Sequence, residues 1–214
     1  VSVMNIKSLL AATFAVASMS MLSMAQTRTI EHEYSEFDAI SVSDGFKVSF
    51  VESDGYSAKF KVNDAFESYV QCYVKAGTLY IGVDDKSIPK EVKKSFKGKN
   101  SDDPVLEATV YVPSLKAVTL SDNCTFSCDK DINAPKFTLE LSGTSSVSNL
   151  NIHVAESAVI TVSKKAKLSS VNVKAEDKVT VNAEGNASVV LEYSAKTLEV
   201  NNSGSAELAI NGQA

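Results

Sequence analysis

The sequence predicts an all-β protein, built as a parallel β-helix-like solenoid with coils of about 21 residues and a decorated N-terminal part. Three observations support this fold class. The 214 residues include 26 Val and 30 Ser but only 9 Gly and 4 Pro, which favours many short strands. Apolar and polar residues alternate with a period of two, as in residues 138–141 and 159–162. A turn recurs at residues 122, 143, 164, 185 and 204, at spacings of 21, 21, 21 and 19.

Equivalent positions of this repeat form columns of like chemistry. Four residues before the turn slot and four residues after it, every side chain is apolar, and two residues after it every side chain is small. Such columns are expected where each coil stacks on the same residues of the next coil. The apolar columns are Val118, Leu139, Ile160, Val181 and Val200, and Phe126, Val147, Leu168, Val189 and Leu208; the small column is Cys124, Ser145, Ala166, Ala187 and Ala206.

An antiparallel β-sandwich is the competing fold, since it also uses short alternating strands. Its turns do not recur at a fixed interval with matched columns. A single coil of this repeat cannot form a core, whereas five stacked coils can. We therefore expect the repeat coils to occupy about residues 115–214.

The first half is less regular and is predicted to supply decorated opening coils of the same domain. Strands are expected at residues 37–42, 46–51, 58–62, 77–83 and 105–112, with turns at Asp44-Gly45 and Asp54-Gly55. A short helix is expected within residues 64–74, capped by Asp64. No linker separates this half from the repeat, so residues 26–214 are predicted to form a single β-solenoid domain.

Residues 1–25 are predicted to be a signal peptide. Lys7 supplies a positive n-region, residues 9–22 form a short apolar region, and Ser23 and Ala25 place small residues before a cleavage site. The apolar run is shorter than the roughly 20 residues that span a membrane. We therefore expect export to the periplasm, the outer-membrane surface or the medium, with no transmembrane segment after cleavage.

The charge balance argues against a nucleic-acid partner. After removal of the leader, the chain has 20 basic and 26 acidic residues. A protein with net negative charge has no overall electrostatic attraction to a polyanion such as a nucleic acid. The three cysteines, Cys72, Cys124 and Cys128, leave at least one thiol unpaired. A Cys124–Cys128 disulfide is possible only across a tight turn, and buried free thiols are the default. We expect no metal site and no cofactor.

An ordered set of segments identifies a family resemblance. Residues 37–42, 77–81 and 112–118 are followed by Ser-Gly turns at Ser142 and Ser203. In this order they resemble the head GIN domain family of auto-transporter adhesins, whose function is unknown. The resemblance implies a β-helix-like fold and an adhesin-like role. Asp122 and Lys164 stand where the pattern has glycine, so both are strained if the slot requires a positive φ.

The resemblance does not imply self-export in this chain. An autotransporter needs a membrane barrel of its own, with strands of about 9–11 residues. Here the repeat runs to the C-terminal end of the sequence, so we do not expect an autotransporter.

No catalytic residues are predicted. Asp129 and Asp131, with Lys164, Lys165 and Lys167, could form the acidic and basic cluster of a polysaccharide-cleaving β-helix, but solvated corners explain them more simply. His153 is expected to face outward on a strand, and His32 is expected in a flexible start.

The basic segment 86–99 is the predicted binding site. Lys90, Lys93, Lys94 and Lys97 could recognise an acidic glycan, with a solvated loop as the simpler explanation. Ile88, Val92 and Phe96 recur every four residues, which indicates a short amphipathic helix over residues 87–96 that lies on the solenoid.

These observations favour a non-enzymatic, adhesin-like envelope protein that binds a glycan or a cell-surface protein. The Ser column beside the turn slot, continued by Asn201, Asn202 and Asn211, offers hydrogen-bonding groups, although these Ser could simply satisfy the backbone. The alternatives are a polysaccharide-cleaving enzyme of the pectinase or lyase type and a purely structural envelope accessory protein.

Overall fold

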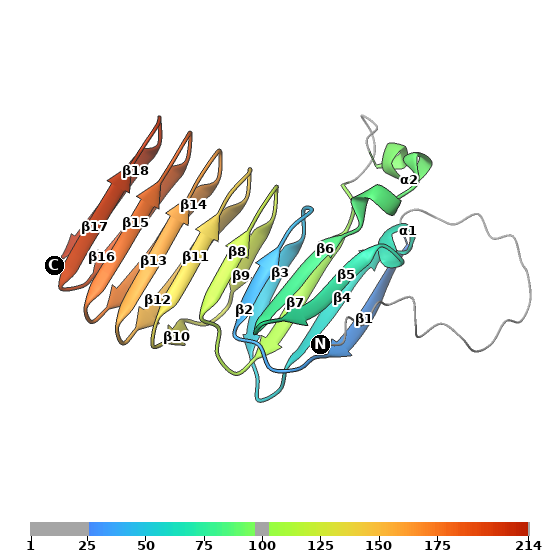
Figure 1. Cartoon of the computed structure of the whole chain (residues 1–214), viewed down its shortest axis with the longest axis horizontal. Helices are drawn as coiled ribbons and strands as arrows, with labels where there is room; N and C mark the ends of the chain where they lie inside the picture. The colour runs from blue at the N-terminus through green and yellow to red at the C-terminus, as the bar shows by residue number, and fades with distance from the viewer. Residues whose placement is uncertain (1–25, 97–102, 214) are drawn as a thin grey trace, which may run out of the picture.

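Two β-sheets face each other across a continuous apolar core. The computed structural model describes residues 26–96 and 103–213. The predicted signal peptide and Lys97 lie outside these residues. Figure 1 shows the strand pairs stacked side by side along the long axis, from the N-terminal third to the C-terminal pair. None of the described helices is long and apolar enough to cross a membrane.

The C-terminal half is a parallel solenoid of five coils, which confirms the predicted fold class. Each coil contributes one strand to each sheet, and each strand pairs in parallel with the equivalent strand of the next coil. The competing antiparallel sandwich is excluded for this half. The coils are β8 (Ala117–Leu120) and β9 (Thr125–Cys128), β11 (Phe137–Leu141) and β12 (Ser146–Val154), β13 (Ser157–Val162) and β14 (Lys167–Ala175), β15 (Lys178–Ala183) and β16 (Ser188–Ser194), and β17 (Thr197–Asn202) and β18 (Glu207–Gln213); β10 (Ile132–Ala134) pairs with β12.

The predicted columns form the core. In the first four coils the apolar and small columns are buried, and Val181 and Val189 have no exposed surface. The hydroxyl of Ser145, which is fully buried in the small column, donates to the carbonyl of Ser142 at 2.7 Å. Each buried aliphatic side chain contributes about 1.5–3 kcal/mol. Only the last coil departs from this pattern, since Val200 is 43% exposed.

The turn slot requires the left-handed conformation, as predicted from its glycines. Asp122 and Lys164 have φ values of 58° and 61°, against 72° at Gly143 and Gly185 and 74° at Gly204. Successive turns are joined by backbone hydrogen bonds, such as the one from the amide of Lys165 to the carbonyl of Gly143 at 2.9 Å. The two non-glycine residues therefore carry the expected strain, which costs roughly 1–2 kcal/mol each.

The N-terminal third continues both sheets and then reverses direction. β2 and β3 pair in parallel with β8 and β9, and β6 and β7 add another parallel layer beyond them. β1, β4 and β5 pair antiparallel and form the last layers. His32 lies in β1, so its prediction in a flexible start was wrong. The strands are β1 (Thr27–Glu33), β2 (Ala39–Val42), β3 (Lys47–Glu52), β4 (Ser57–Asn63), β5 (Val70–Lys75), β6 (Thr78–Val83) and β7 (Leu106–Val112).

Short helices lie at this N-terminal end (Figure 1). They are α1 (Asp64–Glu67), the 3-10 turn η2 (Asp85–Ser87) and α2 (Lys90–Ser95). The cap of α1 is Asn63 rather than the predicted Asp64, which instead forms an ion pair with Arg28 at 3.3 Å. The predicted helix over residues 87–96 is shorter in the structure, because Ile88 is extended and α2 begins only after Pro89. The apolar residues still pack inward as predicted: Ile88 is buried, and Phe96 packs edge-to-face on Phe66 with ring centroids 5.0 Å apart.

Candidate functional site

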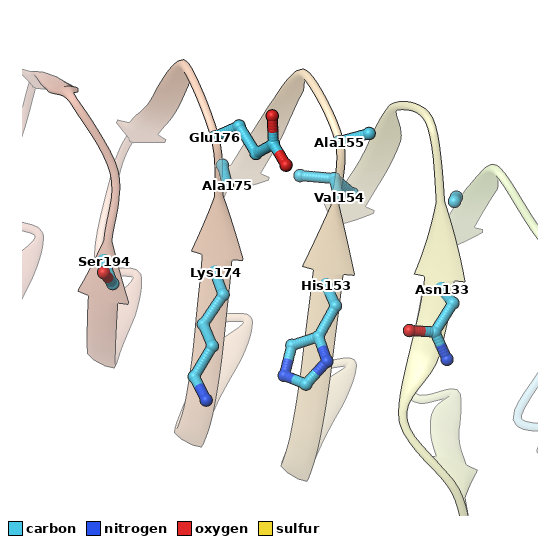
Figure 2. Close-up of a pocket in the computed structure, with 9 residues that line it drawn as sticks. Asn133, His153, Val154, Ala155, Lys174, Ala175, Glu176 and Ser194 are labelled. Carbon is cyan, nitrogen blue, oxygen red and sulfur yellow. The ribbon is translucent and has the colours of Figure 1, made fainter.

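An outward-facing row of polar side chains crosses four neighbouring strands of one sheet. The register pairs Asn133 with His153, His153 with Lys174, and Lys174 with Ser194. Adjacent strands lie about 4.8 Å apart, so these side chains form a regular ladder. Figure 2 shows His153 and Lys174 pointing the same way from adjacent strands. We call Asn133, His153, Lys174 and Ser194 the polar row.

A shallow hollow of about 430 Å³ lies along the polar row, where the strands run into the corners that lead back to the other sheet. Small apolar side chains line part of it, so a ligand could approach the backbone closely. Glu176 adds a carboxylate at one corner (Figure 2). The remaining lining residues are Ala134, Val154, Ala155 and Ala175, together with the four members of the polar row.

One end of the polar row is held in place by a carboxylate. Asp131 accepts a hydrogen bond from the amide of Asn151 at 3.0 Å, and its other oxygen lies 3.7 Å from Nδ1 of His153. The side-chain amide of Asn133 donates to the backbone carbonyl of Asp131 at 3.1 Å. The Asp131 carboxylate thus lies beside the His153 ring, at a distance longer than a hydrogen bond, while 36% of the His153 side chain stays exposed.

The other end of the row keeps its polar groups available. Within residues 26–96 and 103–213, the side chains of Lys174 and Ser194 form neither an ion pair nor a side-chain hydrogen bond. Glu176 likewise has no ion-pair partner in this part of the chain. The hollow thus offers an ammonium, a hydroxyl, an imidazole and a carboxylate within one surface, a set suited to binding a hydroxyl-rich or carboxylate-bearing ligand.

A second polar ladder, on the other sheet, is occupied by its own contacts. Asn201 donates to Asn182 at 3.0 Å, and Asn182 donates to Thr161 at 3.3 Å. These residues line a smaller hollow of about 170 Å³. Because its amides bond to one another, this ladder has fewer free groups than the polar row.

The structure does not bring the acidic and basic candidates of the sequence together. Asp131 bonds to Asn151, whereas Lys167 pairs with Ser146 at the start of the same strand pair. Five residues of β12 separate these two contacts, and the left-handed residue Asn149 (φ 56°) lies between them. Lys164 and Lys165 lie further away, in the turn itself. Among the described residues, no group of three or more His, Cys, Asp or Glu is placed to hold a metal ion.

The predicted lysine site lies at the N-terminal end, on α2. Lys90 and Lys94 are exposed, while Lys93 forms an ion pair with Asp85 at 2.8 Å. The structure therefore neutralises part of the positive charge that the sequence suggested.

The Ser column serves the backbone at two of its positions. The hydroxyls of Ser121 and Ser163 donate to the carbonyls of Val42 and Leu141, each at 3.3 Å. This is the simpler of the two explanations offered by the sequence.

All three cysteines are free thiols, and no Cys124–Cys128 disulfide is formed. Burial raises the pKa of Cys72 to about 12 and that of Cys124 to about 11, so both thiols stay protonated at neutral pH. Burial also raises the pKa of Cys128. A protonated thiol is a poor nucleophile, so the buried Cys72 and Cys124 are expected to react slowly at neutral pH.

The polar row was not predicted from the sequence, although the spacing of its residues was a usable signal. His153 was correctly predicted to face outward, but it was treated as an isolated residue. Lys174 follows it by 21 residues, Asn133 precedes it by 20, and Ser194 follows Lys174 by 20. The predicted columns lie within four residues of the turn slot. The polar row lies further along the strands, at outward positions that also repeat at about one coil period.

Fold and site together define a parallel β-solenoid with a polar, ligand-accessible outer face. The chain belongs to the family described as "Putative auto-transporter adhesin, head GIN domain", which matches residues 36–159. The family resemblance is therefore confirmed.

Solved structures extend the likeness to most of the chain. An adhesin structure from Bacteroides fragilis, described as putative, is 13% identical with a TM-score of 0.53, covering 89% of this chain and 98% of its own. A structure from Parabacteroides distasonis described as a putative lipid binding protein is 18% identical with a TM-score of 0.44, covering 88% and 97%. The first supports the fold. No curated protein matches the chain.

Proposed function

We propose that this is an exported envelope or surface protein that acts as a non-enzymatic, adhesin-like binder, and that the polar row and its hollow hold a glycan or a glycan-bearing surface molecule. The observation that carries the proposal is that the ammonium of Lys174, which has no ion-pair partner among the described residues, lies beside the His153 ring on the adjacent strand. Family membership supports an adhesin-like role. Export rests on the leader predicted at residues 1–25.

A polar, shallow surface suits a glycan better than an apolar ligand. Sugar hydroxyls need several hydrogen-bonding groups spread over an extended face, and neighbouring coils repeat such groups about every 4.8 Å. The small residues beside the row let a flat ring lie close to the sheet. Among the described residues that line the hollow, Glu176 is the single carboxylate, whereas a glycosidase uses a pair.

A glycan array tests the proposal. The protein is purified after export, its binding to the array is measured, and the glycans are analysed for reaction products. The double variant His153→Ala/Lys174→Ala should weaken binding at least about tenfold, since charge-assisted hydrogen bonds contribute roughly 1.5–3 kcal/mol each. Lys165→Ala, which removes an equally exposed lysine at the turn, is the matched control and should bind normally.

The same assay separates the alternatives. Cleaved products would establish the polysaccharide-cleaving enzyme instead. Absence of both binding and cleavage would refute the proposal and leave the structural accessory role. Lys90→Ala/Lys94→Ala tests the lysine site predicted from the sequence, which we propose as a secondary contact for acidic glycans.

A further inference from the structure

We propose that the outer face of the other sheet carries a second binding site, where a neutral sugar ring stacks on Tyr80. This site is separate from the polar row, and either can exist without the other. Tyr73 and Tyr80 lie directly opposite each other on β5 and β6, and their rings stack with centroids 5.1 Å apart and planes 15° apart. Tyr73 thus covers one face of the Tyr80 ring, and the other face is turned toward the next strand, β2.

The two strands beyond Tyr80 leave that ring face open. Ser41 on β2 pairs with Tyr80, and Thr119 on β8 pairs with Ser41. Both side chains are short, whereas a tyrosine ring stands well above the sheet. Among the described residues, Tyr73 is the only aromatic residue whose ring contacts Tyr80. The outer face therefore drops from the Tyr80 ring to a low floor two strands wide.

A carboxylate stands on the far side of this floor. Glu140 on β11 pairs with Thr119, so it lies three strands from Tyr80, or about 14 Å between Cα atoms. The Glu140 side chain is exposed, and within residues 26–96 and 103–213 it forms neither an ion pair nor a hydrogen bond. The hydroxyls of Ser41 and Thr119 are equally without a hydrogen bond in this part of the chain. We call Tyr80, Ser41, Thr119 and Glu140 the tyrosine step.

This arrangement matches the chemistry of a sugar ring. The C–H groups on one face of a pyranose are weakly positive and pack on the negative face of an aromatic ring. At a contact separation of about 3.5–4.0 Å, a sugar ring stacked on Tyr80 lies over Ser41. Its far hydroxyls then extend over Thr119 toward Glu140, and an ionised carboxylate is a strong acceptor for hydroxyl groups. A single ammonium group spans this floor less well, because cation–π contact holds it within about 6 Å of the ring centroid.

The charges around the tyrosine step favour a neutral sugar over an acidic one. Glu140 is the only charged residue in β6, β2, β8 and β11. Shortly after β2, the carboxylate of Asp44 accepts a hydrogen bond from the amide of Val83 at 3.0 Å, which holds a second negative charge beside β6. Lys116, just before β8, is engaged by Asp38 in an ion pair at 2.6 Å. These carboxylates would repel the carboxylate of an acidic sugar.

Titration of the exported protein with neutral oligosaccharides tests the proposal. The probes are linear hexamers of glucose, mannose, galactose and xylose, with hexagalacturonate as the acidic comparison, and NMR follows the ring protons of Tyr80. These signals should shift with at least one neutral hexamer and stay unchanged with hexagalacturonate. The proposal is overturned if no neutral hexamer shifts them, or if hexagalacturonate shifts them equally.

Variants of the tyrosine step check that the sugar lies on the ring. Tyr80→Ala should weaken binding of the neutral hexamer about tenfold or more, whereas Tyr80→Phe keeps the ring face and should bind like the wild type. Tyr111→Ala is the matched control, because Tyr111 is a half-buried tyrosine on the outer face of β7 in the opposite sheet, and it should bind normally. If Tyr80→Ala fails to fold, Thr119→Phe fills the floor and should abolish binding. Normal binding by folded Tyr80→Ala or Thr119→Phe would refute the site.

The same titration separates this site from the polar row. His153→Ala/Lys174→Ala should bind the neutral hexamer as tightly as the wild type does. If that double variant loses binding while Tyr80→Ala retains it, the sugar lies at the polar row, so the tyrosine step is refuted and the proposed function stands. Shifts at Tyr80 that persist in the double variant would support the tyrosine step even if the polar row binds no glycan.

Discussion

The two ends of this solenoid terminate the same stack in opposite ways. At the N-terminal end the chain reverses: β1, β4 and β5 run antiparallel, and Phe66 and Phe96 pack between short helices. At the C-terminal end the last coil has the same columns as those before it, and Val200 is left 43% exposed. Because each coil of the repeat is buried by the next one, the last described coil keeps its apolar columns partly exposed, whereas antiparallel strands and short helices cover the other end.

The largest expected effect contrasts one buried residue near each end. Phe60 in β4 is 1% exposed and packs edge-to-face on Phe46, so Phe60→Ala should lower the free energy of unfolding by about 3–5 kcal/mol. Leu208, near the C-terminal end, is only partly buried, so Leu208→Ala should cost less than half as much. Urea unfolding at low protein concentration measures both values.

Leu168→Ala is the internal control for this comparison, since Leu168 occupies the same column as Leu208 but is 1% exposed. It should cost about 2–5 kcal/mol. Equal losses for Leu168→Ala and Leu208→Ala would contradict the prediction and mean that the last described coil is as well covered as the others.

A smaller effect is expected from alkali, through a buried thiol in each region. Burial raises the pKa of Cys124, in the regular stack, to about 11, above its unfolded value near 9. The stabilisation from the protonated folded thiol is therefore fully present below about pH 9 and is lost as the pH rises to 11. The loss amounts to roughly 2–3 kcal/mol at its end point.

Comparison of unfolding free energies at pH 8 and pH 10.5 checks this expectation. The wild type should lose more stability than Cys124→Ala, because the alanine variant has no thiol to ionise when it unfolds. Cys72→Ala tests the N-terminal end in the same way, although Cys72 is hydrogen-bonded to Tyr34, whose pKa burial raises as well. Identical pH dependence in the wild type and Cys124→Ala would contradict the prediction.

The smallest effects concern the turn column. A Cβ at Gly143 would lie 2.5 Å from the carbonyl oxygen of Asp122, while one at Gly204 would come no closer than 3.0 Å to Gly185. Gly143→Ala should therefore cost more than the roughly 1–2 kcal/mol of a left-handed alanine, and Gly204→Ala should stay near that value. Thermal unfolding ranks the two.

Lys164→Gly is the reciprocal test of the same column. It relieves a left-handed lysine at φ 61° and should stabilise the protein by roughly 0.5–1 kcal/mol after the entropy cost of glycine. A destabilising Lys164→Gly would show that the lysine side chain makes contacts that outweigh its backbone strain.

The regular half of the protein could be predicted from the amino-acid sequence. Each coil contacts only its neighbours, at a separation of about 21 residues. Residues that stack in space therefore appear in the sequence as matching columns, such as Val118 and Leu139. The left-handed turns at Asp122 and Lys164 followed from the same alignment. The outward members of the polar row were readable in this way too, because His153 and Lys174 stand one period apart.

The architecture of the N-terminal end and the composition of the candidate site became visible in the folded structure alone. The insertion of β7 between β3 and β4 joins segments more than forty residues apart, and no repeat records such a contact. The contact of Asp131 with His153 depends on an irregular loop between β9 and β10, outside the periodic pattern. The exposure of Val200 depends on which strands follow it, whereas its column alone predicts a buried residue. Contacts between coils recur at a fixed sequence separation, so they can be predicted from the sequence. The other contacts follow no repeat, so the sequence pattern does not predict them.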